Sequence, residues 1–232
     1  MSTATLPTPA APPAAPAVTP PPVGSPTAPV GARPTPAAVM PFQAYTAFRR
    51  FSVAEYQKMI AAGILTDEDK VELLDGYVVH KMPRNPPHDG SITALNEILV
   101  RLIPPGWVVR CQTGATLAES QPEPDIAIAR GDRRLYFTRH PLPSDLALVI
   151  EVADSSLDRD RTDKARIYAG DGVPVYWVVN LVDRVVEVYS NPTGPVPGAH
   201  YQRQQVYHLG ASVLVELDGK SVGSVVVSEI LP

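Results

Sequence analysis

The sequence predicts a mixed α/β or α+β fold, in which helices pack against a central sheet. Two short runs rich in Ile, Val and Leu, at 124–129 and 146–152, are bounded by proline or polar residues, as buried strands are. The second run is apolar on both of its alternating faces, which indicates a central strand covered on both sides. Helical apolar spacing before these runs predicts one helix, and a second helix is expected after the central strand, so helices should pack against the sheet.

The composition is that of a globular protein with one domain and a tail. The chain has 232 residues, of which 44% are hydrophobic and 19% charged, and its formal net charge is −4. This acidic balance excludes a protein that coats nucleic acid through a global positive field, so contact with DNA would need a local basic strip. Cys111 is the one cysteine, which excludes an internal disulfide; we expect it to be buried and inert. Neither a membrane span nor a secretory signal is visible, so we expect a cytoplasmic protein that has no membrane partner.

Residues 1–40 are predicted to form a Pro/Ala-rich disordered tail. Arg33 is their only charged residue, and prolines such as Pro20, Pro21 and Pro22 prevent helix and sheet from propagating. An inert tail and a Pro-rich ligand for another domain are both open. The folded domain is expected over 41–232 and should begin near Phe42.

The first elements are a capped helix and a hairpin. Ser52 and Glu55 form a capping box that starts a helix over 53–62, and Gly63 ends it. Residues 71–80 are predicted to be a hairpin closed by Asp75-Gly76.

A long helix and two strands follow the hairpin. Apolar residues recur on one face over 88–103, which predicts a helix, and strands are expected at 107–112 and 124–129. A long charged connection over 130–145 then leads to the central strand.

The last third of the chain alternates again between helix and strand. A helix is expected over about 158–169, ended by Gly170 or Gly172. Further strands are predicted at 174–180, 184–190, 201–209 and 212–217, the last two peripheral. The apolar stretch 225–231 is expected to dock against the domain.

Two carboxylates mark a candidate site. Asp125 stands where one strand begins and Glu151 where the next ends, so antiparallel pairing would bring both to one edge of the sheet. Carboxylates held together in an apolar sheet repel each other unless a cation lies between them. Paired oxygens suit a hard divalent ion, most plausibly Mg²⁺, with Mn²⁺ as a substitute.

The helix after the central strand supplies a candidate cation. Asp160, Lys164 and Tyr168 are spaced i, i+4, i+8 and share one face. If that face turns towards the carboxylates, Lys164 can hold a water nucleophile or stabilise charge on a phosphorane. Glu72 would add a further carboxylate, and Gln112 a neutral polar contact.

Five motifs, taken in order, resemble those of one family. They are Glu72-Leu-Leu-Asp-Gly76, Pro124-Asp-Ile-Ala-Ile128, Glu151-Val-Ala-Asp-Ser155, Asp160-Arg-Thr-Asp-Lys164 and Gly172-Val-Pro-Val-Tyr-Trp177. Together they resemble the Uma2 family (DUF820) of restriction-endonuclease-like proteins, within the PD-(D/E)XK nuclease superfamily. The resemblance spans residues 48–231, and the order and spacing of the set make it specific.

The resemblance implies a restriction-endonuclease-like mixed sheet flanked by helices and a Mg²⁺-dependent endonuclease that acts on DNA. Asp125, Glu151 and the Val152 carbonyl would bind the metal, and Glu72 would be an additional acid. Ala153 stands where the superfamily motif has lysine, so the resemblance moves that role to Lys164. By analogy, we expect a homodimer, because one site cuts one strand and a duplex needs two.

Simpler explanations exist for each of these residues. Asp125 can merely begin a strand, and an ion pair of Glu151 with Lys164 or Arg166 needs no metal. Asp160 and Lys164 can be an ordinary surface pair. His88 is most simply a loop or first-turn residue, and Tyr168, Tyr176 and Trp177 core aromatics.

Two other functions stay open. One is a catalytically inactive nucleic-acid-binding or regulatory module, in which Arg130, Arg133, Arg134 and Arg139 would grip phosphates. The other is a protein-interaction subunit that binds partners through its Pro-rich tail.

Overall fold

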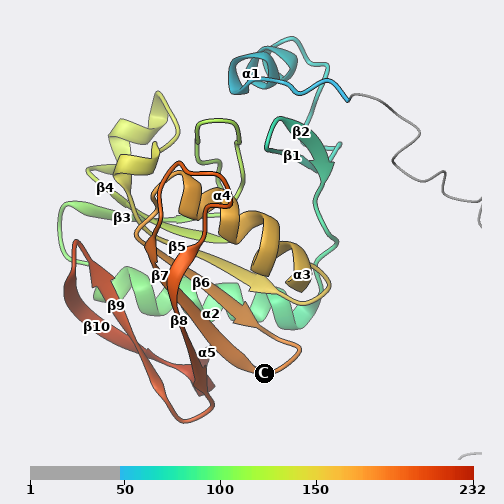
Figure 1. Cartoon of the computed structure of the whole chain (residues 1–232). Helices are drawn as coiled ribbons and strands as arrows, with labels where there is room; N and C mark the ends of the chain where they lie inside the picture. The colour runs from blue at the N-terminus through green and yellow to red at the C-terminus, as the bar shows by residue number, and fades with distance from the viewer. Residues whose placement is uncertain (1–47) are drawn as a thin grey trace, which may run out of the picture. The chain divides into compact units, whose positions relative to one another are not determined.

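A six-stranded mixed sheet forms the centre of the fold, in the order β3-β4-β5-β6-β7-β8 (Figure 1). The structure is a computed structural model and describes residues 48–232; the predicted tail and the domain start near Phe42 lie outside the described residues. The strands are β3 Trp107–Cys111, β4 Ile126–Arg130, β5 Leu146–Ala153, β6 Val175–Asn180, β7 Val185–Pro192 and β8 Tyr201–His208. Neighbours pair antiparallel except β5 and β6, which are parallel. The predicted α/β class with a mixed central sheet is confirmed.

β5 is the central strand that the sequence predicts, since all eight of its residues are buried. Its parallel pairing with β6 requires a crossover, which is the helical segment between them. That segment has three parts, α3 Leu157–Arg159, the π-helical turn η4 Asp160–Lys164, and α4 Ala165–Gly170. The predicted helix is therefore present, but the π turn within it was not foreseen.

Each face of the sheet is covered, as Figure 1 shows. On one face lie α2 (Pro86–Leu102), the β9–β10 hairpin (Ser212–Leu217 and Lys220–Val226) and α5 (Val227–Ile230). The crossover helix covers the other face. The predicted docking of the C-terminal stretch is confirmed by the burial of Val227 and Ile230, whereas β10 was not predicted as a strand.

The N-terminal elements follow the sequence closely. α1 (Val53–Ala61) begins at Ser52 with the predicted capping box. β1 (Val71–Leu74) and β2 (Tyr77–His80) form the predicted hairpin, whose turn has left-handed φ values of 48° at Asp75 and 78° at Gly76. Backbone hydrogen bonds between Leu73 and Gln121 tie the hairpin to the rest of the domain.

Two local expectations are corrected. The connection 130–145 is not a plain loop, because it contains the short 3-10 helices η2 Arg133–Phe137 and η3 Pro143–Asp145. Cys111 is exposed rather than buried, since it ends β3, an edge strand. Within residues 48–232, no helix is long and apolar enough to cross a membrane.

Candidate active site

Antiparallel pairing of β4 with β5 brings Asp125 and Glu151 to one edge of the sheet, as the sequence predicts. Ile126 pairs with Ile150, so the residue before β4 lies beside the residue after Ile150. The Val152 backbone N–H donates a hydrogen bond to Asp125 Oδ2 at 2.9 Å. Both carboxylates are buried, Asp125 at 8% exposure and Glu151 at 3%.

Lys164 lies among three carboxylates. Its Nζ is 3.0 Å from Glu151 Oε1, 3.4 Å from Glu72 Oε1 and 3.9 Å from Asp160 Oδ1. Lys164 and Asp160 are both buried, so they are no ordinary surface pair. Arg166, the other candidate partner of Glu151, pairs with Asp75 instead.

The π turn and its neighbours hold this face of the helix in place. The Tyr168 hydroxyl donates to Glu151 Oε1 at 2.8 Å, and the Tyr176 hydroxyl donates to the Asp160 carbonyl at 3.0 Å. The Ser156 hydroxyl donates to Asp160 Oδ2 at 2.6 Å. Tyr168, Tyr176 and Trp177 are buried in the core, as expected, but the Tyr168 hydroxyl also contacts the Glu151 carboxylate.

Glu72 arrives from β1, about fifty residues before Asp125 in the chain. Its side chain is buried, and its Oε2 accepts a hydrogen bond from the Glu123 backbone N–H at 3.2 Å. Gln112 contributes only its backbone N–H, which donates to the Asp125 carbonyl at 3.0 Å. The structure thus brings together Glu72, Asp125, Glu151 and Lys164, the four side chains that the sequence proposed.

His88 is a site residue that sequence reasoning placed only in a first turn. Asn85 caps α2 by accepting from the His88 backbone N–H, so His88 is indeed in the first turn. Its Nε2 lies 3.4 Å from Asp125 Oδ2. The cap itself is anchored, because Asn85 Nδ2 donates to Asp154 Oδ2. The signal was the Asn-Pro-Pro-His order, which fixes the first turn but not the direction in which it faces.

Burial and neighbouring charges shift the pKa values of the site carboxylates in different directions. Burial, together with the charges of Asp160, Asp125 and Glu72, raises the pKa of Glu151 far above its usual value, against the opposing effect of Lys164. Burial also raises the pKa of Asp160. Burial acts to raise the pKa of Asp125 too, but hydrogen bonds from His88 and Val152 outweigh it and lower that pKa.

Lys164 is held in its charged form. Burial alone would lower its pKa, but the charges of Glu151, Glu72 and Asp160 outweigh burial and raise it. An ammonium whose pKa is raised does not give up its proton near neutral pH, so Lys164 acts as a fixed cation.

The site fits a divalent ion in its donor chemistry. Within residues 48–232, no three carboxylate, imidazole or thiol side chains are gathered into a ready metal cluster, and Lys164 lies among the carboxylates. Yet neither Asp125 Oδ1 nor Glu151 Oε2 accepts a hydrogen bond from the described part of the chain. Both residues, with Val152 and Glu72, line a cavity of about 70 Å³, enough for an ion or about five waters.

Charge around this cavity favours a cation. We refer to it as the catalytic cavity. Its acidic lining residues outnumber its lysines and arginines by six to four. The acids are Glu72, Glu123, Asp125, Glu151, Asp154 and Asp160, and the bases are Lys81, Arg84, Arg159 and Lys164. Free carboxylate oxygens and a negative excess are what Mg²⁺ requires.

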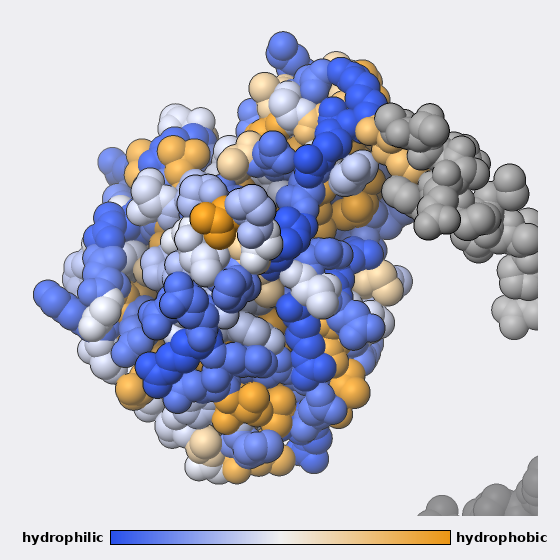
Figure 2. Space-filling model, in the orientation of Figure 1, coloured by the Kyte–Doolittle hydropathy of each residue, from blue (hydrophilic) through white to orange (hydrophobic). Residues whose placement is uncertain are grey.

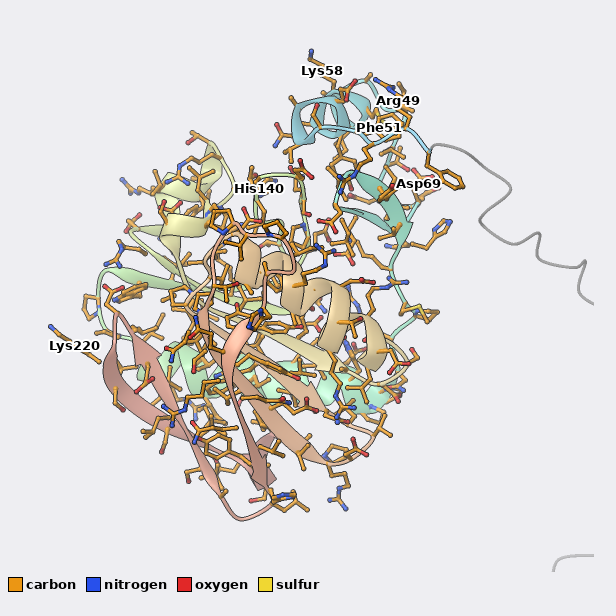
Figure 3. The ribbon with its side chains drawn as sticks, in the orientation of Figure 1. Arg49, Phe51, Lys58, Asp69, His140 and Lys220 are labelled. Carbon is orange, nitrogen blue, oxygen red and sulfur yellow. The ribbon has the colours of Figure 1, made fainter. Side chains whose placement is uncertain are left out.

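The four arginines proposed to grip phosphates do not line the catalytic cavity. Arg130 pairs with Asp218 and lies over the Trp107 ring, and Arg139 pairs with Asp145. The His140 ring, from the same connection, lies beside Gly114, where an added β-carbon would come within 3.1 Å of His140 Cε1 (Figure 3 labels His140). Any phosphate contacts near the carboxylates must therefore come from Lys81, Arg84 and Arg159 rather than from the 130–139 arginines.

Comparison with known proteins agrees with this architecture. A model of the Uma2 family, described as "Putative restriction endonuclease", matches residues 53–221. One similar solved structure is the 1.96 Å crystal structure of "a putative nuclease belonging to DUF820" from Anabaena variabilis ATCC 29413. It is 14% identical, has a TM-score of 0.55, and the match covers 78% of this chain and 97% of that one, which shows a shared fold. The search of curated proteins found no match.

Proposed function

Because the chain belongs to the Uma2 family, described as putative restriction endonucleases, we propose that it is a Mg²⁺-dependent endonuclease that hydrolyses phosphodiester bonds in DNA. Family membership supports a nuclease-like function. The metal dependence, the DNA substrate and a cytoplasmic place of action belong to the proposal.

One observation carries the proposal, the burial of Lys164 among Glu72, Glu151 and Asp160 beside Asp125. Removing several charges from water is costly, and a hydrophobic cluster of similar volume is often as stable or more so. Strongly shifted pKa values that gather at one cavity are characteristic of functional sites. The arrangement is therefore better explained by chemistry than by stability.

Asp125, Glu151 and the Val152 carbonyl are the groups that would hold the ion, and Glu72 is placed to support a second ion or a bridging water. When bound, a divalent ion supplies Lewis-acid activation of the phosphate and lowers the pKa of water. His88 Nε2 and the Val152 N–H both contact Asp125 Oδ2 and so orient this carboxylate.

Lys164 serves as an electrostatic group and not as a general base, because its pKa is raised. Its ammonium can orient the attacking water or stabilise the negative charge that builds on the phosphoryl oxygens. Tyr168 holds Glu151 through its hydroxyl. The lysine role absent at Ala153 is thus filled from the crossover helix.

A second candidate is the non-catalytic nucleic-acid-binding module. It is favoured by the same central position of Lys164, whose ammonium already neutralises part of the acidic cluster without a metal. This module would bind nucleic acid with a steep salt dependence and leave it intact.

Nicking of a supercoiled plasmid distinguishes the two, because a closed circle has no ends and reports endonuclease action alone. We expect cleavage that requires Mg²⁺ or Mn²⁺, falls at least about 100-fold in Asp125→Asn and Glu151→Gln, and persists in Glu229→Gln, an exposed acid on α5. Cleavage that survives in Asp125→Asn contradicts the proposal. Salt-sensitive binding of nucleic acid without cleavage supports the non-catalytic module instead. Cleavage of RNA but not of DNA contradicts the proposed DNA substrate.

We also propose a homodimer, since cutting a duplex needs two sites. Light scattering should then give a mass about twice the 24.9 kDa of one chain.

A further inference from the structure

A second and larger cavity adjoins the catalytic cavity. It has a volume of about 720 Å³ and lies among α1, the start of β1 and the segment 81–84. We refer to it as the side cavity. Five residues line both cavities, so the two are neighbours: Lys81, Met82, Pro83, Arg84 and Glu123. The side cavity lies at the end of the domain that carries α1, β1 and β2, the elements labelled in Figure 1.

The two cavities differ in volume, so they can hold ligands of different size. The catalytic cavity, at about 70 Å³, accepts an ion and a few waters but no nucleotide. The side cavity falls within the range of about 300–1,000 Å³ typical of small-molecule sites. A strand whose phosphate reaches Asp125 must therefore place its neighbouring sugar and base outside the catalytic cavity, and the side cavity is the adjoining space.

One part of the wall of the side cavity is apolar. Tyr56 is buried at 3% exposure, with its hydroxyl directed to the Val71 carbonyl at 3.4 Å, and Ile60, Leu65 and Met82 complete the wall. Ile60 and Met82 are 44% and 40% exposed, although both are large apolar residues. Figure 2 shows apolar residues among the polar ones at this end of the domain.

The rim of the side cavity carries two cations, Lys70 and Arg84, and one acid without an ion pair in the described part of the chain, Asp67, so a positive excess remains. Neither Lys70 nor Arg84 forms an ion pair with any residue in 48–232, and both are exposed. Lys81, by contrast, is paired with Glu123. Unpaired cations beside an apolar wall match a nucleotide, which is an anionic phosphate joined to a planar base.

The rim is also fixed in position. The Lys81 backbone N–H donates to the Lys70 carbonyl at 2.8 Å, which joins the two segments that carry the cations. Asp69 accepts hydrogen bonds from the Thr66 N–H and hydroxyl, at 2.7 and 3.0 Å, and closes the turn before β1 (Figure 3). This acid is therefore engaged within its own turn, next to Lys70.

We infer that the side cavity binds the nucleotide next to the scissile phosphate, with its base on the Ile60–Met82 wall and its phosphate at Lys70 and Arg84. The inference deepens the proposed nuclease function and names the part of the substrate that this site takes. Preference for particular neighbouring bases would then arise here, away from the ion-binding carboxylates.

The test is equilibrium binding of two fluorescent probes to the full chain without divalent ions. One probe is an octathymidylate and the other is an abasic phosphodiester of the same length. Because cleavage plays no part, loss of binding and absence of nuclease activity are separate results. The variants are Lys70→Ala with Arg84→Ala, and Ile60→Ala with Met82→Ala.

The controls have the same residue types but lie outside the lining of the side cavity. Lys58→Ala is paired with Arg203→Ala, both at exposed residues, and Ile64→Ala controls the apolar pair. The Lys58 side chain points away from the β1–β2 hairpin in Figure 3. We expect the cation variant to weaken both probes about 10-fold or more. The apolar variant should weaken the thymidylate probe about 5-fold or more and leave the abasic probe unchanged. Equal losses on both probes in the apolar variant, or binding equal to the controls in either, would overturn the inference.

Discussion

Lys164 has more carboxylates around it than one ammonium can neutralise. Glu151, Glu72 and Asp160 all lie within 4 Å of its Nζ, and each is at least 97% buried. Burial is the largest cause of the raised pKa of Glu151 and of Asp160, and the charges of the neighbouring carboxylates raise both pKa values further. Protons move within such a cluster as a shared set and not residue by residue. The cluster is therefore costly to the free protein.

Replacing Glu151 with glutamine should stabilise the metal-free protein. The folded pKa of Glu151 lies above the unfolded value of about 4.3, so the folded state binds the extra proton. Its contribution to stability is complete below that unfolded value and is lost as pH rises through the folded pKa. Denaturant unfolding should find Glu151→Gln about 1–3 kcal/mol more stable than wild type at pH 8, with the difference shrinking towards pH 4.

Glu229→Gln is the matched control, because Glu229 is exposed and should show no such trend with pH. A Glu151→Gln variant less stable than wild type at pH 8 would show that the ionised carboxylate stabilises the fold.

Asp125 and Glu151 could be predicted because each stands at the end of an apolar run. Asp125 comes just before one clearly apolar strand and Glu151 near the end of the next. Antiparallel pairing of these two strands then brings the two carboxylates together. His88 could not be predicted in the same way, because its role depends on how α2 lies against the sheet. No local pattern in the sequence encodes that packing.

The π turn is the element that aims Lys164. A π turn rotates the side chains that follow it relative to a regular α-helix, and such turns are frequent at functional sites. Arg161, from the same turn, is anchored on β7 by Glu187, with Arg161 Nε 3.0 Å from both carboxylate oxygens. Asn180 and Tyr189 also donate to Glu187, which is 1% exposed. The turn is thus fixed at the cluster by Lys164 and at β7 by Arg161.

Arg161→Ala should destabilise the protein, because it leaves the buried Glu187 carboxylate without its charge partner. We expect a loss of about 2–3 kcal/mol in the free energy of unfolding, less than for a fully buried pair because Arg161 is 35% exposed. Adding Glu187→Gln should restore much of the loss, since the amide keeps neutral hydrogen bonds. Arg134→Ala, at an exposed arginine, is the control, and a double variant no better than Arg161→Ala would rule out this explanation.

Elements with strong local signals were predicted well, and those that depend on tertiary contacts were not. The Ser52 capping box and the Asp75-Gly76 turn each depend on residues only a few positions apart in the sequence, and both are present. The π turn has no such spacing, because it arises where the crossover helix is held at two points. β10 was missed because Gly223 and the serines beside it dilute its strand pattern, and its pairing with β9 includes an irregularity there.

At the scale of the whole domain, the candidate site is assembled from segments far apart in the chain. β1, the start of β4, the end of β5, the first turn of α2 and the crossover helix all contribute groups to it. The sheet brings the strand ends together, and the helices on its two faces supply His88 and Lys164. The side cavity adds α1, so the same end of the domain carries both the carboxylates and the inferred nucleotide site.

The most direct test of this account is calorimetric titration of Mg²⁺ and Mn²⁺ into the purified protein, beside Asp125→Ala, Glu151→Ala and the exposed control Glu229→Ala. We predict binding with a Kd of about 1 mM or tighter, lost in both site variants and kept in the control. Equal binding by wild type and the two site variants would contradict the account. So would absence of binding by wild type when DNA is present to supply phosphate ligands.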